Sequence, residues 1–363
     1  MKQLFTLFFL CGTFSTFAQS LANEQLESFA KNVVIEEANQ YGEDFQMGSV
    51  VVMEQATGNV KCLMNVSRND NGDWQVDREY SHNVKSGHHR AVLGLAVLEA
   101  GVNLSDIFYS TGTYIDPESM IQIHDTNYKH GGYGRIQLWK AIDVSNVCMY
   151  EAAEIVFCKD MASFYINMKK TGILFSDDNP LETEEYIREK FSDHPWDVSG
   201  VMALRDWTTP LQMCMWINAI ANKGRMVSAR LDETDEPNII YEHIGVADEY
   251  IDSLKYALRL AATEGLSQRA NSLLTTVWGI TDVSEPTSEG IKYASFVGFI
   301  PGYSIVVDIA KRGNPTGRII PSRIARKVID YIAQKMMGKT NEQSIASAYY
   351  KPYIRTHLPK GVD

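Results

Sequence analysis

The sequence lacks the closely spaced cysteine pairs that hold structural metal ions. Five cysteines occur in 363 residues, and none of them forms a C-x-x-C pair. Cys11 stands in the leading segment, and the other four stand in apolar stretches, at Cys62, Cys148, Cys158 and Cys214. We therefore expect buried free thiols, with no metal site and no cofactor. A Cys148–Cys158 disulfide stays open as an alternative if the chain is exported.

An excess of positive charge is also absent. The chain carries 34 Lys and Arg against 45 Asp and Glu, a net charge of −11. Nucleic acids and anionic membrane surfaces are polyanions, so neither is expected as a main partner. The apolar fraction of 45% and the charged fraction of 22% are those of an ordinary globular protein. Internal repeats and low-complexity linkers are likewise missing, and the length suits one large domain or two modest ones.

The apolar run near the N-terminus is too short to cross a bilayer, which needs about 20 apolar residues. It spans Leu4–Leu10 after a single lysine, and Thr16 and Ala18 place small residues at the two positions that a signal peptidase reads. This pattern predicts a signal peptide over residues 1–18, with cleavage after Ala18. Lipid attachment at Cys11 is less favoured because the bulky Leu10 precedes it, and an uncleaved anchor is a minor alternative. We expect an exported protein of the periplasm or cell envelope, with no membrane span after cleavage.

Apolar periodicity predicts a mixed helical and β order of elements. Residues 23–41 show the spacing of one helical face, and Met47–Met53 and Lys61–Val66 read as a β-hairpin around a Gly/Asn turn. Phe175–Pro195 is acidic and contains two prolines, which indicates an exposed excursion. The other predicted elements are helices at Ala91–Glu99, Ile136–Ala153, Met161–Lys170, Pro210–Asn222 and Arg323–Met337, and strands at Leu273–Thr281, Tyr293–Ile300 and Tyr303–Ala310.

Strands near both ends of the chain must share one sheet if each is to bury its apolar face. This predicts one domain over residues 19–338, followed by a tail at 339–363. Its sheet lobe takes residues of about 19–85 and 255–338, and an all-helical lobe takes residues of about 86–254. A ligand-binding cleft is expected between the two lobes.

Four segments, in chain order, resemble parts of the transpeptidase domain of penicillin-binding proteins. They are the hairpin Val50–Met64, the stretch Gly131–Asn146, the segment Trp207–Val227 with its T-P-L-Q, and Ser295–Pro301, which reads S-F-V-G-F-I-P. The resemblance covers residues 45–310 and implies the α+β fold of the β-lactamase and transpeptidase superfamily. That fold has an antiparallel five-stranded sheet flanked by helices, plus an all-helical subdomain. These residues support a fold and carry no chemistry themselves.

The first catalytic motif of that family, S-x-x-K, supplies a serine nucleophile and a lysine that takes its proton. Counting back from the end of the helix at Glu99 places this motif on Gly87 to Arg90. Gly87 has no side chain with which to attack a carbonyl. Arg90 keeps its proton at ordinary pH and cannot act as a base.

The other two family motifs, S-x-N and K-T-G, are also altered. The second falls on Val144, Ser145 and Asn146, so only its asparagine remains. The third falls on Val277, Trp278 and Gly279, where only the glycine remains. Loss of the lysine removes charge-assisted binding of a substrate carboxylate. Asparagine near a helix end often just bonds backbone groups, so Asn146 need not be functional.

One alternative alignment supplies Ser86 as the nucleophile with His89 as its base. Histidine is a competent base near neutral pH. However, the one-residue slip rotates the helix by about 100° from its buried pattern and repairs neither of the other motifs. His88 and His89 could also suggest zinc, but no further ligands stand at suitable spacing.

The resemblance therefore implies a transpeptidase-like protein, and the altered motifs predict a pseudoenzyme. It would bind cell-wall peptide or a partner protein of peptidoglycan synthesis. Two alternatives stay open. One is an active acyl-serine transpeptidase that uses Ser86, and the other is a structural scaffold with a closed cleft.

Overall fold

The computed structural model describes residues 23–69, 71–77, 89–117, 119–157, 160–173, 184–191, 208–232, 236–284, 287–313 and 319–339. The expected signal peptide, the candidate residues Ser86, Gly87 and His88, and Cys158 lie outside these ranges, as does nearly all of the expected tail. Within the acidic segment 175–195, Glu184–Phe191 forms helix α6. No helix in the described ranges is both long and apolar enough to span a membrane.

A six-stranded antiparallel sheet forms the centre of the structure. Strands from the two ends of the chain share this sheet as predicted, because β1 near the N-terminus pairs with β12 near the C-terminus on one side and with β2 on the other. In order across the sheet, the strands are β10 (Trp278–Val283), β11 (Ile291–Ile300), β12 (Tyr303–Arg312), β1 (Phe45–Glu54), β2 (Val60–Arg68) and β3 (Trp74–Asp77). The predicted count of five omits β3, whose four residues are too few to give a clear alternating pattern.

Each face of the sheet belongs to a separate hydrophobic core. Val51 and Met53 on β1 face one cluster of buried side chains. Val50 and Val52 on the same strand face the other cluster. Side chains alternate between faces along a strand, so the continuous apolar run of β1 indicates a strand covered on both sides. Buried strands of this kind fix the register, because a one-residue slip would exchange the two faces.

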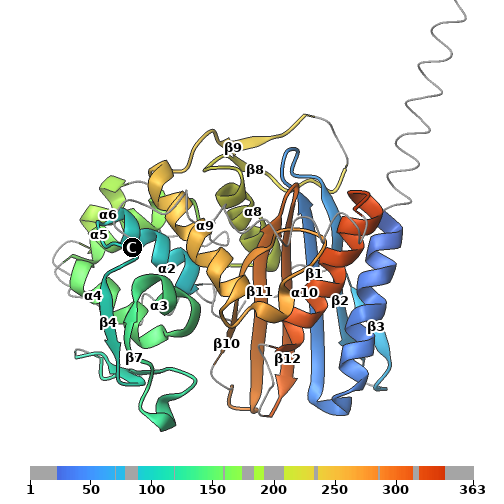
Figure 1. Cartoon of the computed structure of the whole chain (residues 1–363), viewed down its shortest axis with the longest axis horizontal. Coiled ribbons are helices and arrows are strands. Elements are labelled where there is room, and N and C mark those ends of the chain that lie inside the picture. The colour runs from blue at the N-terminus through green and yellow to red at the C-terminus, as the bar shows by residue number, and fades with distance from the viewer. Residues whose placement is uncertain are drawn as a thin grey trace, which may run out of the picture.

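Helices cover both faces of the sheet (Figure 1). The helix of residues 23–39 and α10 lie on one face, where Phe29 stacks on Tyr331 at 4.4 Å between ring centroids. Helix α8 lies on the opposite face against β12 and β1. The longer helices after residue 88 are α2 (His89–Glu99), α3 (Leu138–Val144), α4 (Asn146–Phe157), α5 (Met161–Lys170), α8 (Pro210–Ala221), α9 (Asp248–Thr263) and α10 (Ile319–Tyr331). The short helical turns are η1 (Gly42–Asp44), η2 (Tyr128–His130), η4 (Gln268–Ala270) and the π-helix η5 (Ile332–Met336).

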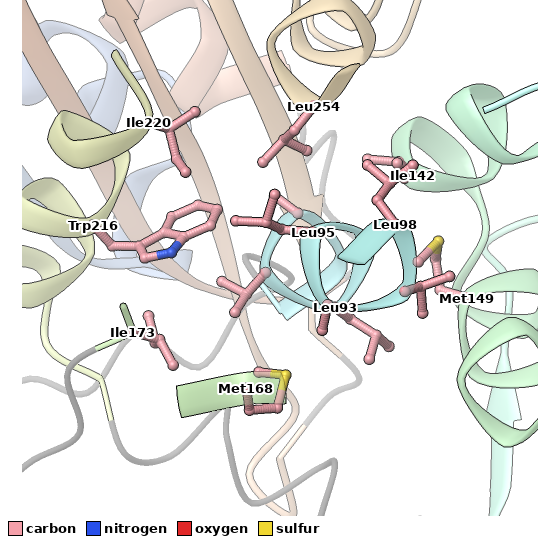
Figure 2. Close-up of a cluster of buried hydrophobic side chains, with 14 of the residues drawn as sticks. Leu93, Leu95, Leu98, Ile142, Met149, Met168, Ile173, Trp216, Ile220 and Leu254 are labelled. Carbon is pink, nitrogen blue, oxygen red and sulfur yellow. The ribbon is translucent and has the colours of Figure 1, made fainter. Parts of the chain in front are cut away.

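Helix α2 runs through the middle of the larger core, as the predicted helix Ala91–Glu99 requires. Its leucines point in several directions, toward Trp216 of α8, Leu254 of α9 and Met149 of α4 (Figure 2). Gly94 permits close contact with α3, since a Cβ there would lie 3.0 Å from the Ile142 side chain. A helix that is buried on nearly every side serves as a fixed frame for the residues at its ends.

The helix predicted at Pro210–Asn222 is confirmed together with its start and stop signals. The Thr209 side chain accepts a hydrogen bond from the Gln212 backbone N–H at 3.2 Å, and Gln212 closes the capping box. Pro210 occupies the first turn, as expected from its fixed φ. After the helix, Gly224 adopts a φ of +90° and reverses the chain.

Three predicted elements differ from the structure. The helix expected at Ile136–Ala153 is two helices, because Ser145 adopts an extended conformation between α3 and α4. The strand expected at Leu273–Thr281 begins at Trp278, and Leu273 is 66% exposed. The region expected to be all helical also contains short two-stranded ribbons. These are β4 (Ile107–Ser110) with β7 (Gly134–Gln137), β5 (Thr113–Ile115) with β6 (Gln122–His124), and β8 (Met226–Val227) with β9 (Ile239–Tyr241). The lobe boundaries near residues 85 and 255 stay predictions.

Candidate functional site

Arg90 lies in the first turn of α2 and is completely buried. Its Nε lies 2.9 Å from Oδ2 of Asp282, which is itself buried. One terminal nitrogen donates to the backbone oxygen of Asp143 at 3.0 Å, and the other donates to the backbone oxygen of Thr281 at 2.9 Å. The guanidinium therefore ties α2 to the end of α3 and to strand β10.

The motif alignment predicts that Arg90 stands where the family has its proton-accepting lysine. Arginine stays protonated in proteins, and its planar fork suits several fixed acceptors at once. A buried charge is tolerated only when it is paired and hydrogen-bonded. Arg90 meets that requirement inside the protein, so it acts as a structural tie and offers no base.

Asp143 holds the α3 end of this arrangement. Its carboxylate lies 2.7 Å from Nζ of Lys140 and accepts the Leu266 backbone N–H at 3.1 Å. A Cβ at Gly265 would lie 2.3 Å from Oδ2 of Asp143, so this close approach needs glycine. The loop after α9 thus holds Asp143, in the last turn of α3, whose backbone carbonyl accepts a hydrogen bond from Arg90.

The second motif position is shaped by a helix cap. Ser145 accepts the backbone N–H of Cys148 at 3.0 Å, which caps the first turn of α4. The Ser145 hydroxyl donates to Asp125 at 2.8 Å, and Asp125 also accepts the Ser110 hydroxyl and the Val147 backbone N–H. Ser145 and Asp125 are both buried. Ser145, at the variable middle position of this motif, is therefore committed to the start of the helix.

The remaining second-motif residues offer little chemistry. Val144 is buried and apolar. Asn146 donates through Nδ2 to the backbone oxygen of His124 at 3.4 Å, a long contact. Asn146 therefore bonds a backbone group, as its alternative role predicted, although the carbonyl belongs to a residue 22 positions earlier in the chain.

The two apolar residues of the third motif separate to opposite sides of the sheet, as strand geometry predicts. The Val277 side chain is fully buried in the core under α10. Trp278 packs against the other core and stacks on Phe299, with ring centroids 5.1 Å apart and planes 10° apart. The glycine of this motif has a packing role: a Cβ at Gly279 would lie 2.5 Å from the Phe296 ring.

Arg90 meets β10 beyond these predicted positions. Its partners are Thr281 and Asp282, and Thr281 lies four residues, about 13 Å of strand, past Val277. Sequence reasoning missed Asp282. The available signal was a lone acidic residue in an otherwise apolar strand, which requires a buried partner.

His89, the base of the alternative alignment, is also buried, with only 6% of the residue exposed. Its ring meets the Tyr150 ring edge-on, with centroids 5.9 Å apart. The structure thus places His89 within the core contacts between α2 and α4. Its expected partner Ser86 lies outside the described residues.

The three cysteines that the structure describes are as the sequence predicted. Cys62, Cys148 and Cys214 are buried and form no disulfide, so the open alternative of a disulfide at Cys148 is not what the structure shows. Burial raises the pKa of Cys148 to about 12, against a smaller lowering by the Ser145 hydrogen bond. Burial also raises the pKa of Cys214. Thiols of this kind are inert because the reactive species is the thiolate.

Comparison with known proteins gives no sequence relative and a consistent set of structural ones. No family model and no curated protein match the sequence. Among solved structures, the transpeptidase domain of Burkholderia pseudomallei penicillin-binding protein 3 matches with a TM-score of 0.64 and 13% identity, over 86% of this chain and 95% of that one. The chain has the penicillin-binding-protein transpeptidase fold.

Two further structures share the transpeptidase fold. A peptidoglycan glycosyltransferase from Burkholderia ambifaria matches with a TM-score of 0.61 and 14% identity, over 85% of this chain and 95% of that one. The PonA1 protein of Mycobacterium tuberculosis, solved with penicillin V, matches with a TM-score of 0.63 and 18% identity, over 86% of this chain and 84% of that one. Structural likeness at these low sequence identities establishes the fold alone, because chemistry depends on the residues of the site.

Proposed function

We propose that this protein is exported to the cell envelope and uses a transpeptidase fold for binding, without acyl-transfer chemistry. The observation that carries the proposal is the environment of Arg90. The side chain that the motif alignment assigns to the base position carries a permanent charge. It is buried against Asp282 and two backbone carbonyls.

Acyl transfer needs an attacking hydroxyl as well as a base. Gly87 stands at the nucleophile position and has no hydroxyl. For scale, removal of the nucleophile alone lowers kcat by about 10⁶ in a serine protease. Here the nucleophile, the base and the carboxylate-binding lysine are all altered, so ordinary catalysis is not expected.

The ligand class of the proposal is cell-wall peptide or a protein of peptidoglycan synthesis. Support comes from the fold, which this chain shares with proteins named for peptidoglycan synthesis. It also comes from the predicted signal peptide at residues 1–18, which would deliver the protein to the compartment where the cell wall is assembled.

A closed scaffold is the second candidate, and one observation favours it. Strand β10 lies at the edge of the sheet, where a peptide could add as a further strand. Arg259 donates to the backbone oxygen of Val277 at 2.9 Å, and Arg90 donates to that of Thr281 at 2.9 Å. Two carbonyls at this edge are therefore already bonded within the chain, which disfavours strand addition there.

Two measurements test the proposal. A fluorescent penicillin should leave the protein unlabelled on a denaturing gel, while an active penicillin-binding protein on the same gel is labelled. Muropeptides should raise the melting temperature if the protein binds cell-wall peptide, because a ligand that binds only the folded state stabilises it. Covalent labelling would contradict the proposal. An unchanged melting temperature with every muropeptide and candidate partner would favour the scaffold.

A further inference from the structure

A lysine outside the three motifs lies beside the aromatic pair at the start of β10. Lys255 is on α9, and its Nζ lies 5.9 Å from the centroid of the Phe299 ring. Phe299 in turn stacks on Trp278. Phe299 is buried, while Lys255 and Trp278 are both partly exposed. The cation and the indole therefore share Phe299 as a packing partner, and each is partly exposed to solvent.

The Lys255 ammonium has no close counter-ion. Among the residues that the structure describes, it makes no hydrogen bond and no ion pair within 4.0 Å. Burial lowers the pKa of Lys255, Asp252 opposes this, and Lys223 lowers the pKa further. Lys223 belongs to the turn after α8 and has a positive φ of 54°. The positive charge of Lys223 therefore adds to that of the partly buried Lys255 ammonium.

This arrangement is unusual in a chain with a net charge of −11. A partly desolvated ammonium is costly unless an anion pairs with it. Contact with the face of Phe299 offsets some of that cost. This contact supplies no hydrogen-bond acceptor for the three N–H donors of the ammonium. The chain has acidic residues in excess, yet none within the described ranges forms an ion pair with Lys255 within 4.0 Å.

We propose that Lys255 and the Trp278–Phe299 pair form a binding site for a carboxylate carried on a small apolar body. The ammonium pairs with the carboxylate, and the exposed part of the indole packs against the apolar body. The terminal carboxylate of a short peptide has this chemistry. The site rests on the proposed binding role only for its choice of peptide probes.

Binding of three acetylated tripeptides to the full chain tests this site. The probes are tri-alanine with a free terminal carboxylate, its amide, and an Ala-Glu-Ala amide, measured by calorimetry and by the Trp278 indole signal in NMR. The free acid should bind at least about tenfold more tightly than the tri-alanine amide, the scale of a charge-assisted hydrogen bond. Comparable binding of the Glu peptide would support the carboxylate site and assign its source to an acidic side chain.

The Lys255→Met variant removes the ammonium and keeps an unbranched apolar side chain. It therefore separates the effect of the charge from the packing of the aliphatic part of the lysine. It should lower the affinity for the free acid to that of the amide and leave the unfolding midpoint unchanged. Lys129→Met is the matched control, because the exposed Lys129 also lies over an aromatic ring, at 5.7 Å from the Tyr128 centroid. This control should bind the acid like the unchanged protein.

Three outcomes would overturn the site: equal binding of acid and amide, no binding of any probe, or undiminished binding to Lys255→Met. None of them requires acylation, since the probes contain no β-lactam. A failure of this site is therefore distinguishable from a failure of the non-catalytic proposal, which covalent labelling by penicillin would contradict.

Discussion

Replacement of Arg90 by methionine should destabilise the protein strongly. Both Arg90 and Asp282 are buried, with relative exposures of 0% and 2%. Removal of one partner of a buried ion pair leaves an uncompensated charge and costs about 3–5 kcal/mol. Native domains have only about 5–15 kcal/mol of stability in total, so the loss is a large fraction of it.

The double variant Arg90→Met with Asp282→Asn should recover part of this loss. It removes the stranded carboxylate, and residues in direct contact typically show interaction energies of about 0.5–3 kcal/mol. Urea unfolding, followed by tryptophan fluorescence and circular dichroism, measures both variants. Arg225→Met is the control, because the Nε of Arg225 lies 3.7 Å from Oε2 of the exposed Glu242, and surface pairs contribute only about 0.2–1 kcal/mol.

Two results would refute this reasoning. One is an Arg90→Met variant that unfolds within about 1 kcal/mol of the unchanged protein. The other is a double variant that is no more stable than the single one. Either result would mean that Arg90 is not the structural tie described above, and the base position would then be open to a functional role.

Three further predictions concern the motifs, a helix cap and pH. Gly87→Ser combined with Arg90→Lys should not give fast acylation by penicillin, because the second and third motifs stay altered; acylation at the rate of an active enzyme would contradict this. Thr209→Ala should cost about 1 kcal/mol in urea unfolding through the lost cap, and no loss would dispute the cap's contribution. The Asp248 hydrogen bond raises the pKa of His243 in the folded protein. The contact between His243 and Asp248 therefore stabilises the fold fully below the ordinary histidine pKa of about 6.5. This stabilisation is lost as the pH rises through the pKa of His243 in the folded protein. It amounts to roughly 0.2–0.5 kcal/mol because both groups are exposed, and His243→Gln should remove this pH dependence.

Much of the fold could be predicted from the sequence because its signals are local. The β-branched run of β1, the all-apolar face of α2 and the Thr209 cap each act within a few residues. The strands at the two chain ends could be joined into one sheet because each needed cover for an apolar face. The structure joins these strands into one sheet, which also contains β3, a strand that was not predicted.

The elements that differed depend on contacts between distant residues. The break at Ser145 is supported by Asp125, twenty residues earlier in the chain, and a continuous apolar pattern conceals it. The late start of β10 reflects side-chain bonding before it, where Ser272 bonds to Asp330 of α10 and to the Leu274 backbone. Local bonding of this kind competes with a strand ladder.

At the site, residue chemistry was predictable and partners were not. The inability of Arg90 to act as a base follows from the side chain alone. The burial of Arg90 against Thr281 and Asp282 could not be predicted without the fold, because Arg90 lies far from these two residues in the sequence. Lys255 gave no sequence signal, since a lysine on an amphipathic helix is ordinarily solvated.

Intact-mass spectrometry after long incubation with excess penicillin tests the central claim most directly. The unchanged protein and Ser86→Ala should both keep their original mass, because Gly87 offers no nucleophile and Arg90 no base. A stoichiometric adduct on the unchanged protein that maps to Ser86 and is absent from Ser86→Ala would contradict the account. It would establish acyl-serine chemistry through Ser86 instead.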